Sequence, residues 1–414
     1  MGKTIFILIT LILSLSLSAS ASDKEKEIDK KVDKIHQKIL SVDSHTDTPL
    51  RLMQPGFDLS VRHDPVKDHS KVDFPRMKEG CLDAAFFGVF VSQGKRNPEG
   101  NQKARQRALL LFDTIDSMLK RYPDLAGLAL TPDDAWQLRK EGKAAIFIGV
   151  ENGYPIGKDI DMVKILYDRG ARYITLCHTK NNDICDSSTD TVEFNGLSEF
   201  GVNVVKVMNR TGMIIDVSHI SDKSFYDVLS VSKAPVIASH SCARALCNNP
   251  RNLSDSMLVA LAENDGVIQM CILSDYVKTP LPNPARDSAR ASLRKKFNNF
   301  DNLGEVEMKA ARKEWYALDD LFPQKLATVS DVVDHIDHIV AVAGIDHVGI
   351  GTDFDGGGGV TGCFDVSEMK NITRELLKRG YSEGDIQKIW GGNLMRVMKK
   401  VNKVSKNLNK PCGC

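Results

Sequence analysis

Histidine and carboxylate side chains recur in this chain directly after short apolar runs. Six of the runs end in such a side chain, and the residues are His45 with Asp47, Glu151, His178, His219, His240 and Asp353. Imidazole and carboxylate groups without thiolates suit zinc or a similar divalent metal. One such residue alone is more often a helix cap or a structural histidine. Several ionisable groups gathered in one place are costly to bury unless a cation binds them, so the set points to a metal site.

The chemistry that this donor set could support is hydrolysis. Two divalent ions about 3.5 to 4 Å apart, bridged by one carboxylate, are the usual centre of a two-metal hydrolase. Such a centre lowers the pKa of a shared water, so that hydroxide exists at neutral pH, and it polarises the carbonyl that is attacked. A further carboxylate can take up the proton and pass it to the leaving amine.

Eight apolar runs, separated by helix-length segments, must position these side chains. Apolar strands that alternate with helices are typical of a parallel sheet covered by helices, and eight of them fit a (β/α)8 TIM barrel of the α/β class. The carboxyl ends of barrel strands meet at one mouth, so ligands far apart in the sequence become neighbours. The runs are residues 39–43, 82–91, 144–150, 173–176, 213–217, 235–239, 266–272 and 347–351.

Three segments between the runs predict helices. Residues 160–169 end at Gly170 and residues 197–210 end near Gly212, and glycine is suited to the left-handed stop of a helix. Residues 282–323 are densely charged, which predicts a helical insertion before the last strand. Because both charge signs occur along it, we interpret the insertion as a solvated helix pair and not as a binding patch.

The composition bounds the partners and the compartment. The chain has 55 Lys plus Arg and 54 Asp plus Glu, which gives no electrostatic reason to expect a nucleic-acid partner. Residues 1–21 combine Lys3, an apolar run and a small-residue ending, which predicts a cleaved signal peptide and a secreted or periplasmic protein without a membrane span. The remainder is expected to form one catalytic domain over residues 22–400 and a polar tail over 401–414.

Nine cysteines are scattered along the chain, and none forms a CxxC pair. A structural zinc knuckle or a thioredoxin-like site therefore has no support. The pairing of these cysteines stays open at this point.

Taken together, the motifs resemble the membrane dipeptidase family, also called renal dipeptidase or dehydropeptidase, of the amidohydrolase-like metallopeptidases. The resemblance covers about residues 39–398, nearly all of the chain after the signal. No single motif would be specific, but the set is. The motifs are DSHTD at 43–47, GVENG at 149–153, RYITLCH at 172–178, IDVSH at 215–219, SHS at 239–241, PRNL at 250–253, GTDFDG at 351–356 and GGNLMR at 391–396.

This resemblance implies a binuclear zinc enzyme that hydrolyses dipeptides with free termini by a metal-bridging hydroxide. Its substrates would be L-L dipeptides, with L-D dipeptides as a further option. His45 and Asp47 would bind the first zinc, and His219 and His240 the second. Glu151 would bridge both ions.

The same resemblance implies roles for three further residues. Asp353 would contact the substrate and act as the proton carrier beside the first zinc. His178 would stay off the metals, contact the substrate and stabilise the oxyanion that develops on the carbonyl. Arg251 would bind the free carboxylate of the dipeptide by a two-pronged contact, which suits its guanidinium.

Some features depart from the mammalian members of the family, and two other functions stay open. The tail has no terminal apolar run of the kind that precedes a lipid anchor, and a homodimer is left as one option. The first alternative function is another amidohydrolase, such as a lactonase or a deaminase, in which Arg251 would not recognise a carboxylate. The second is a non-catalytic periplasmic binding protein, against which Asp353 and His178 argue, because binding a metal alone requires neither.

Overall fold

The computed structural model describes residues 23, 25–300, 303 and 305–410, so the expected signal peptide at residues 1–21 lies outside the described residues. Within this part of the chain the strands form one parallel sheet in the order β1-β2-β4-β5-β6-β7-β8-β9, with β3 paired to β4. The strands are β1 (Val42–Thr46), β2 (Ala84–Phe90), β3 (Ala126–Leu128), β4 (Ala144–Glu151), β5 (Ala171–Thr175), β6 (Ile214–Asp216), β7 (Ile237–Ser241), β8 (Val267–Met270) and β9 (Val348–Ile350).

The two ends of this strand order meet and nearly close the sheet into a barrel. Thr46 of β1 forms a parallel bridge with Phe354, which follows β9. The backbone N–H of Asp47 donates to the carbonyl of Phe354 at 2.8 Å, and that of Asp353 donates to the carbonyl of His45 at 3.0 Å. The fold is therefore the predicted (β/α)8 TIM barrel, and the segments after β1 and β9 lie side by side at its mouth.

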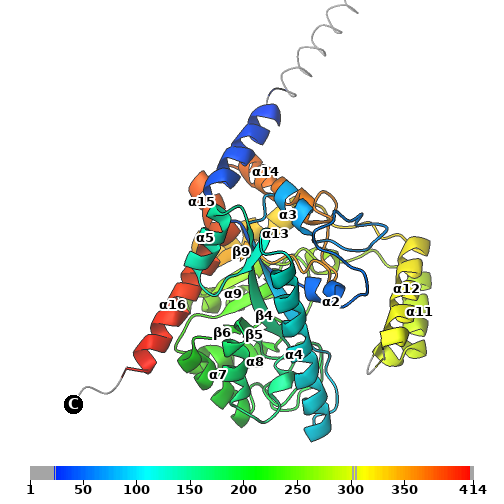
Figure 1. Ribbon diagram of the computed structural model, residues 1–414, viewed down its shortest axis with the longest axis vertical. Helices are drawn as coiled ribbons and strands as arrows, with labels where there is room; N and C mark the ends of the chain where they lie inside the picture. The colour runs from blue at the N-terminus through cyan, green and yellow to red at the C-terminus, as the bar shows by residue number, and fades with distance from the viewer. Residues whose placement is uncertain (1–22, 24, 301–302, 304, 411–414) are drawn as a thin grey trace, which may run out of the picture.

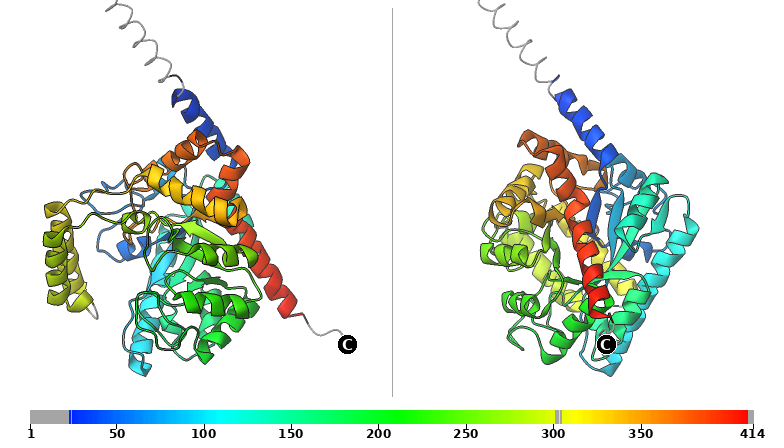
Figure 2. Two further views of the ribbon diagram at one scale, coloured as in Figure 1. Left: turned by 180° about the vertical axis from the view of Figure 1, so that it is seen from behind. Right: turned by 90° about the vertical axis from the view of Figure 1, so that its left-hand side faces the viewer.

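Helices surround the sheet (Figures 1 and 2). They are α2 (Thr48–Leu52), α3 (Phe74–Glu79), α4 (Pro98–Arg121), α5 (Pro132–Lys140), α6 (Met162–Asp168), α7 (Glu199–Thr211), α8 (Asp222–Val231), α9 (Asp255–Glu263), α10 (Ser274–Val277), α11 (Pro284–Lys296), α12 (Glu305–Leu321), α13 (Val329–Ala343), α14 (Lys370–Lys378), α15 (Glu383–Gln387) and α16 (Asn393–Leu408). None of the described helices is both long enough and apolar enough to cross a membrane.

Side chains alternate between two faces of the strands, as the period of a strand requires. Along β2, Phe87 packs in the large apolar cluster that includes the surrounding helices, whereas Phe86 packs in a smaller cluster formed by several strands and α16. In the smaller cluster the ring of Phe86 stacks on Phe147 and Tyr173, with centroids 4.6 and 5.4 Å apart. This alternation places Glu151, four residues after Phe147 on β4, on the inner face.

The sequence prediction differs from the structure at two strands. The first strand was predicted over 39–43 but spans Val42–Thr46, because polar residues that face the mouth are still paired with β2. His45 therefore lies within the strand, and Asp47 follows it in a non-extended conformation. The short strand β3 was not predicted, since Ala126–Leu128 is too brief to form an apolar run; it pairs with the start of β4.

The predicted helices between strands are confirmed to within two residues at each end. The helix predicted over 160–169 is α6, and the one predicted over 197–210 is α7, which ends at Gly212 in the left-handed conformation. The charged insertion forms the helical hairpin of α11 and α12, which stands to one side of the barrel (Figures 1 and 2). The segment expected to be a polar tail continues α16 as far as Leu408, and Val401 within it is buried.

Residues 25–38 form a helical segment that packs against the last part of the chain (Figure 1). Arg374 of α14 donates to Asp29 at 2.8 Å, and Lys38 pairs with Glu383 of α15 at 3.1 Å. His36, which is buried, contacts the hydroxyl of Thr373 in α14 at 2.8 Å. This segment leads directly into β1 at the end of the barrel opposite the mouth.

Candidate metal centre

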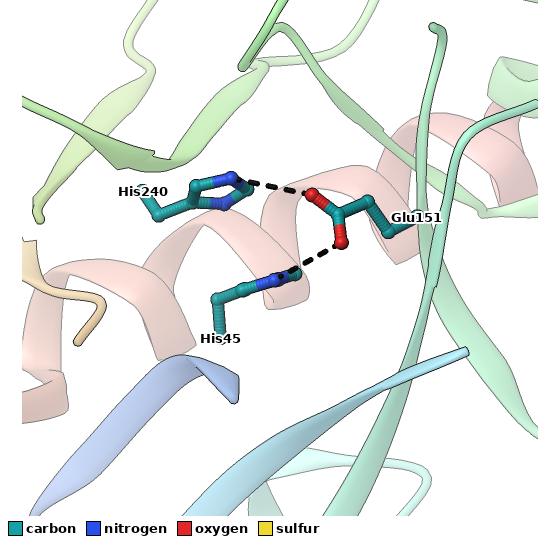
Figure 3. Close-up of side chains that lie close together, drawn as sticks. All are labelled: His45, Glu151 and His240. Carbon is teal, nitrogen blue, oxygen red and sulfur yellow. Dashed lines mark ion pairs between the residues drawn. The ribbon is translucent and has the colours of Figure 1, made fainter. Parts of the chain in front are cut away.

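Glu151 lies among four histidines at the mouth of the barrel. It is the last residue of β4, while His45 and His240 belong to β1 and β7. His178 and His219 each follow the end of a strand, β5 and β6 respectively. Figure 3 shows His45 and His240 directed at different oxygens of Glu151. Four of the predicted strand ends therefore deliver their imidazoles to one carboxylate.

The two oxygens of Glu151 face different histidines. Its Oε2 atom lies 3.4 Å from Nε2 of His45. Its Oε1 atom lies 3.1 Å from Nε2 of His219, 3.4 Å from Nε2 of His240 and 3.7 Å from Nε2 of His178. The carboxylate thus divides the histidines into one side with His45 and another with the remaining three.

Two further carboxylates lie on the His45 side. Nε2 of His45 is 3.9 Å from Oδ2 of Asp47, and ligand atoms of His45, Asp47 and Asp353 all lie within 4.8 Å of one another. The same limit holds for His45, Glu151 and His240, and for Glu151, His178 and His219. The structure therefore brings together all seven of the predicted histidines and carboxylates.

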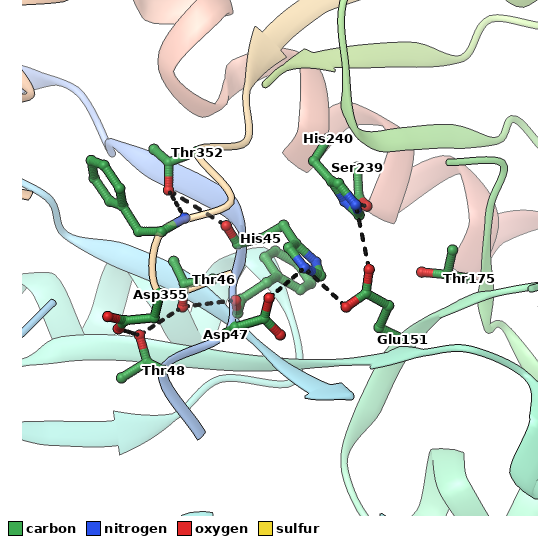
Figure 4. A network of polar contacts seen from close by, with 12 residues as sticks. His45, Thr46, Asp47, Thr48, Glu151, Thr175, Ser239, His240, Thr352 and Asp355 are labelled. Atoms are coloured by element: carbon green, nitrogen blue, oxygen red, sulfur yellow. Dashed lines mark hydrogen bonds and ion pairs between the residues drawn. The ribbon is translucent and has the colours of Figure 1, made fainter. Parts of the chain in front are cut away.

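Buried polar residues fix the orientation of the ligand side chains. Nδ1 of His45 contacts the hydroxyl of Tyr173 at 2.7 Å, and Nδ1 of His240 contacts the hydroxyl of Ser239 at 2.8 Å (Figure 4). Asp216 accepts from the backbone N–H of Ser239 at 2.8 Å and from its hydroxyl at 2.6 Å. With Nδ1 engaged in this way, both histidines present Nε2 to the centre, which is the usual arrangement around a bound metal.

The backbone is locally unusual at this centre. His219 and Asp353 have φ values of 71° and 59°, a region that residues other than glycine rarely adopt. A Cβ atom at Gly356 would collide with the carboxylates of Asp47 and Asp353. A Cβ atom at Gly149 would likewise collide with the ring of Tyr173. Left-handed turns and missing Cβ atoms thus let these side chains approach one another, a pattern found at functional sites.

The charges of the centre favour a cation. Burial alone would lower the pKa of His45, but the carboxylates of Glu151, Asp47 and Asp353 outweigh it and raise that pKa to about 10. Burial would raise the pKa of Glu151, but His45 and His178 lower it well below its ordinary value. The surrounding carboxylates therefore favour a positive charge at His45, which a proton or a bound metal ion can supply.

The other acids have raised pKa values because they are buried next to like charge. Burial, with a contribution from Glu151, raises the pKa of Asp353 to about 7, although His45 and Arg251 act in the opposite direction. The pKa of Asp47 is raised well above its ordinary value by burial and by Glu151. The pKa of Asp353 thus lies near neutral pH, which suits a group that takes up and releases a proton.

Burial also keeps the remaining histidines neutral. It lowers the pKa of His240 to about 4, with a further contribution from His45, and it lowers the pKa of His219 well below its ordinary value, with a contribution from Arg251. Burial lowers the pKa of His178 as well. A neutral imidazole is the form that binds a metal ion, so these side chains are already in the required state.

Several buried atoms lack the hydrogen-bond partner that burial normally demands. Among the described residues, Nε2 of His45 and Oδ1 of Asp47 accept and donate no hydrogen bond. The Nε2 atoms of His219 and His240 are only 2.8 Å apart although both rings have lowered pKa values. Converging lone pairs of this kind, in a set of nitrogen and oxygen donors without sulfur, fit a bound divalent metal such as zinc.

Arg251 lies beside the histidines and is almost completely buried, with 3% of its surface exposed. One Nη atom donates to the backbone carbonyl of His240 at 3.1 Å, and the guanidinium lies 5.4 Å from the ring centroid of Tyr276 in α10. Its Nε atom has no hydrogen-bond partner among the described residues. A buried guanidinium with a spare donor next to the cluster is suited to an anionic group.

Comparison with known proteins decides the family. The pattern of the membrane dipeptidases, peptidase family M19, matches residues 29–412. The chain belongs to the membrane dipeptidase family. It is accordingly a metallo-dipeptidase, a hydrolase with a cluster of candidate metal ligands at the mouth of its barrel.

Relatives agree with this membrane dipeptidase assignment. The chain is 32% identical over 372 residues to dipeptidase tcpJ of Claviceps purpurea, covering 88% of this chain and 77% of that one. The crystal structure of the probable dipeptidase PvdM from Pseudomonas aeruginosa superposes with a TM-score of 0.79 at 31% identity, covering 92% and 99%. A metallo peptidase from Rhodobacter sphaeroides, liganded with a phosphinate mimic of the dipeptide L-Ala-D-Ala, shares the fold with a TM-score of 0.69 at 22% identity, covering 88% and 99%.

The remaining histidines of the dipeptidase lie outside the metal cluster, as the sequence predicted. His335 contacts the carbonyl of Val277 at 2.8 Å, and His338 contacts Asp255 at 2.7 Å. His347 contacts the carbonyl of Gly266 at 2.8 Å. The others, His36, His63 and His69, contact Thr373, the carbonyl of Asp58 and the ring of Tyr316.

Sequence reasoning missed the residues that support the ligands of this dipeptidase. Tyr173 and Asp216 lie within motifs of the sequence, but the sequence alone assigns them no role. One signal could have found Asp216: an acid inside an otherwise apolar strand, three residues before His219, must have a buried polar partner. The contact between Tyr173 and His45 has no such signal, because it depends on how β1 and β5 face each other across the barrel.

Proposed function

We propose that this metallo-dipeptidase is a binuclear zinc enzyme. His45 and Asp47 bind one zinc, His219 and His240 bind the other, and Glu151 binds both. The observation that supports this assignment is that the two carboxylate oxygens of Glu151 face different histidines. Oε2 faces His45, and Oε1 faces His219 and His240. When bound, the zinc pair lowers the pKa of a water molecule and polarises the carbonyl of the substrate.

The chain's own residues do the remaining work on the dipeptide. Arg251 binds the free C-terminal carboxylate through its guanidinium donor that has no protein partner. This contact selects peptides whose second residue is the last one. His178, on the opposite side of Glu151 from His45, donates to the carbonyl oxygen as negative charge develops on it. Asp353 takes the proton released by the attacking water and gives it to the leaving amine.

We propose dipeptides with free amino and carboxyl ends as substrates, L-L pairs and also L-D pairs. The L-D option is supported by the Rhodobacter sphaeroides relative of the same fold, whose ligand mimics L-Ala-D-Ala. We also propose that residues 1–21 direct export and are then removed, leaving a catalytic domain at 22–400 followed by the tail. The mass of the mature protein recovered from its natural source tests this cleavage.

A turnover assay with two variants tests the proposed function. Wild type is expected to contain two zinc ions per chain and to hydrolyse L-L and L-D dipeptides, but not their C-terminal amides. Asp353→Asn should lower kcat by about 10²- to 10⁴-fold with both zinc ions retained, since it removes only proton transfer. Arg251→Ala should raise KM by at least about tenfold, because a buried charged hydrogen bond to the carboxylate is lost.

Three results would contradict the proposal. One zinc ion per chain would exclude the bridging role of Glu151. An unchanged KM in Arg251→Ala, or equal hydrolysis of dipeptide amides, would exclude recognition of the carboxylate and would favour another kind of amidohydrolase substrate. Absence of turnover across the whole panel with added zinc would favour a binding protein.

A further inference from the structure

The hairpin of α11 and α12 comes from the insertion before β9, yet it contacts the segment that follows β1. The ring of Tyr316 in α12 stacks on His69, with centroids 3.7 Å apart and planes 9° apart. The hydroxyl of Tyr316 also accepts from Nη2 of Arg51 in α2 at 3.1 Å. Arg312, one turn earlier in α12, joins the contact through Gln54: in the amide orientation that satisfies its neighbours, the Gln54 oxygen accepts from both Arg312 and Arg51.

Arg51 connects Tyr316 to Asp355 at the mouth of the barrel. Its Nε atom donates to Oδ1 of Asp355 at 3.4 Å, and its Nη2 atom donates to the carbonyl of His69. The side chain of Asp355 is fully buried, and that of Arg51 is 9% exposed. A buried ion pair of this kind is costly to break on one side, so the position of Arg51 and the position of Asp355 depend on each other.

Asp355 in turn joins the loop that carries Asp47, a proposed ligand of the first zinc, to the loop that carries Asp353, the proposed proton carrier. Its Oδ2 atom accepts from the hydroxyl of Thr48, the residue after Asp47, at 2.9 Å (Figure 4). Asp355 itself follows Asp353 by two residues in the chain. Its Oδ1 atom also accepts from the backbone N–H of Lys71 at 2.8 Å. A displacement of Asp355 would therefore move Asp47 and Asp353 relative to each other.

The other end of the hairpin is anchored as well. Arg286 at the start of α11 is buried and donates to Gln324 at 2.7 Å, and Gln324 donates to Asp275 of α10 at 2.5 Å. Within the hairpin, Arg290 pairs with Asp319 at 2.7 Å. The hairpin thus contacts the barrel both at the start of α11 and through Tyr316 in α12. These two attachments can hold it in a fixed position relative to the barrel.

We propose that Tyr316 is a positioning residue of the active site: through Arg51 and Asp355 it sets the position of Asp47, and thereby the affinity of the first zinc site, together with the distance between Asp47 and Asp353. This inference rests on the proposed function for the identity of the metal. The insertion, interpreted from its sequence as a solvated helix pair, thus contributes to the chemistry without touching the substrate.

The test compares two substitutions of Tyr316 with a matched substitution of its neighbour. Tyr316→Phe removes the hydroxyl but retains the ring, Tyr316→Ala removes both, and Trp315→Phe is the control. Trp315 lies on the same helix, and its ring contacts with described residues, Arg290, Arg294 and Phe300, are within the hairpin. Binding of Zn²⁺ is measured by competition with a chromophoric chelator, and amide hydrogen exchange is measured in the zinc-free protein.

Tyr316→Ala is expected to weaken one of the two zinc sites by about tenfold, as loss of a partner behind a metal ligand does. Tyr316→Phe should weaken the same site by about threefold, the size of one lost hydrogen bond. Both variants should exchange faster than wild type at residues 47–51 and 353–359, while Trp315→Phe should behave as wild type in both measurements.

Unchanged zinc affinity and unchanged exchange in Tyr316→Ala would overturn the inference, as would an equal effect of Trp315→Phe. General unfolding of Tyr316→Ala would show as faster exchange throughout the barrel, and Tyr316→Phe then decides the matter. If wild type fails to hydrolyse dipeptides while zinc affinity and exchange respond as described, the proposed function fails and the positioning role stands.

Discussion

The two ends of the barrel treat a buried histidine in opposite ways. His36 and His45 are nine residues apart, on either side of the start of β1, and both are at most 4% exposed. Burial lowers the pKa of His36 to about 4, with a contribution from Lys370. Burial acts on His45 in the same direction, but Glu151, Asp47 and Asp353 raise its pKa to about 10.

The difference teaches that burial alone does not mark a functional histidine. At the closed end, Nε2 of His36 contacts the hydroxyl of Thr373, and burial favours the neutral ring. At the mouth, the carboxylates outnumber the charges available to them, so the site requires a cation, and a proton on His45 or a bound metal can supply it. The density of carboxylates around a histidine is therefore the feature that separates a structural role from a metal-binding one.

Removing the carboxylate of Glu151 should have the largest effect on the difference between the two ends of the barrel. Glu151→Gln removes the proposed shared ligand. It also removes a carboxylate that raises the pKa of His45, so this histidine becomes more like His36, whose pKa is lowered by burial. Zinc affinity should fall by more than the roughly 10- to 100-fold that loss of a ligand's partner costs, and turnover should fall to background. Zinc per chain after dialysis and the rate of dipeptide hydrolysis measure this. Glu141→Gln, the same substitution at an exposed glutamate, is the control. Two retained zinc ions in Glu151→Gln would refute the bridging role.

Acid should destabilise the closed end through His36. Its pKa is lower in the folded protein, about 4, than the ordinary 6.5, so the unfolded chain binds the proton more readily between these values. The contribution to stability is complete above pH 6.5 and is lost as the pH falls towards 4, by about 3 kcal/mol in total. Denaturant unfolding of wild type and His36→Gln at several pH values between 7 and 4 tests this. The free-energy difference between the two proteins should shrink as the pH falls, and a constant difference would show that His36 does not titrate as described.

The smallest expected effect sharpens the comparison at the mouth. Tyr173→Phe removes the hydroxyl that contacts Nδ1 of His45 at 2.7 Å but leaves the stacked ring in place. Zinc affinity should fall by about tenfold, because the orientation and basicity of His45 depend on this partner. A chelator competition assay measures the change. Phe147→Leu, which alters the same stack away from His45, should leave zinc affinity near that of wild type.

The metal cluster could be predicted from the sequence because each of its side chains stands at the end of an apolar run. A parallel barrel brings residues at the ends of its strands together, so the sequence alone predicts that His45, Glu151 and His240 meet. The end of β1 could not be placed, since its polar residues are paired in the sheet although they have no apolar signature. The contacts of Tyr316 with Arg51 were beyond prediction as well, because they depend on the direction in which an inserted hairpin leaves the barrel.

The helical segment at residues 25–38 has a consequence for the order of folding. Its contact between His36 and Thr373 spans 337 residues, and the one between Asp29 and Arg374 spans 345. Closing so long a loop has an entropic cost that only a largely formed barrel can offset. During synthesis this segment can contact Arg139 of α5 first, but its contacts with α14 form only after that helix has emerged, so we expect the segment to become fully protected late in folding.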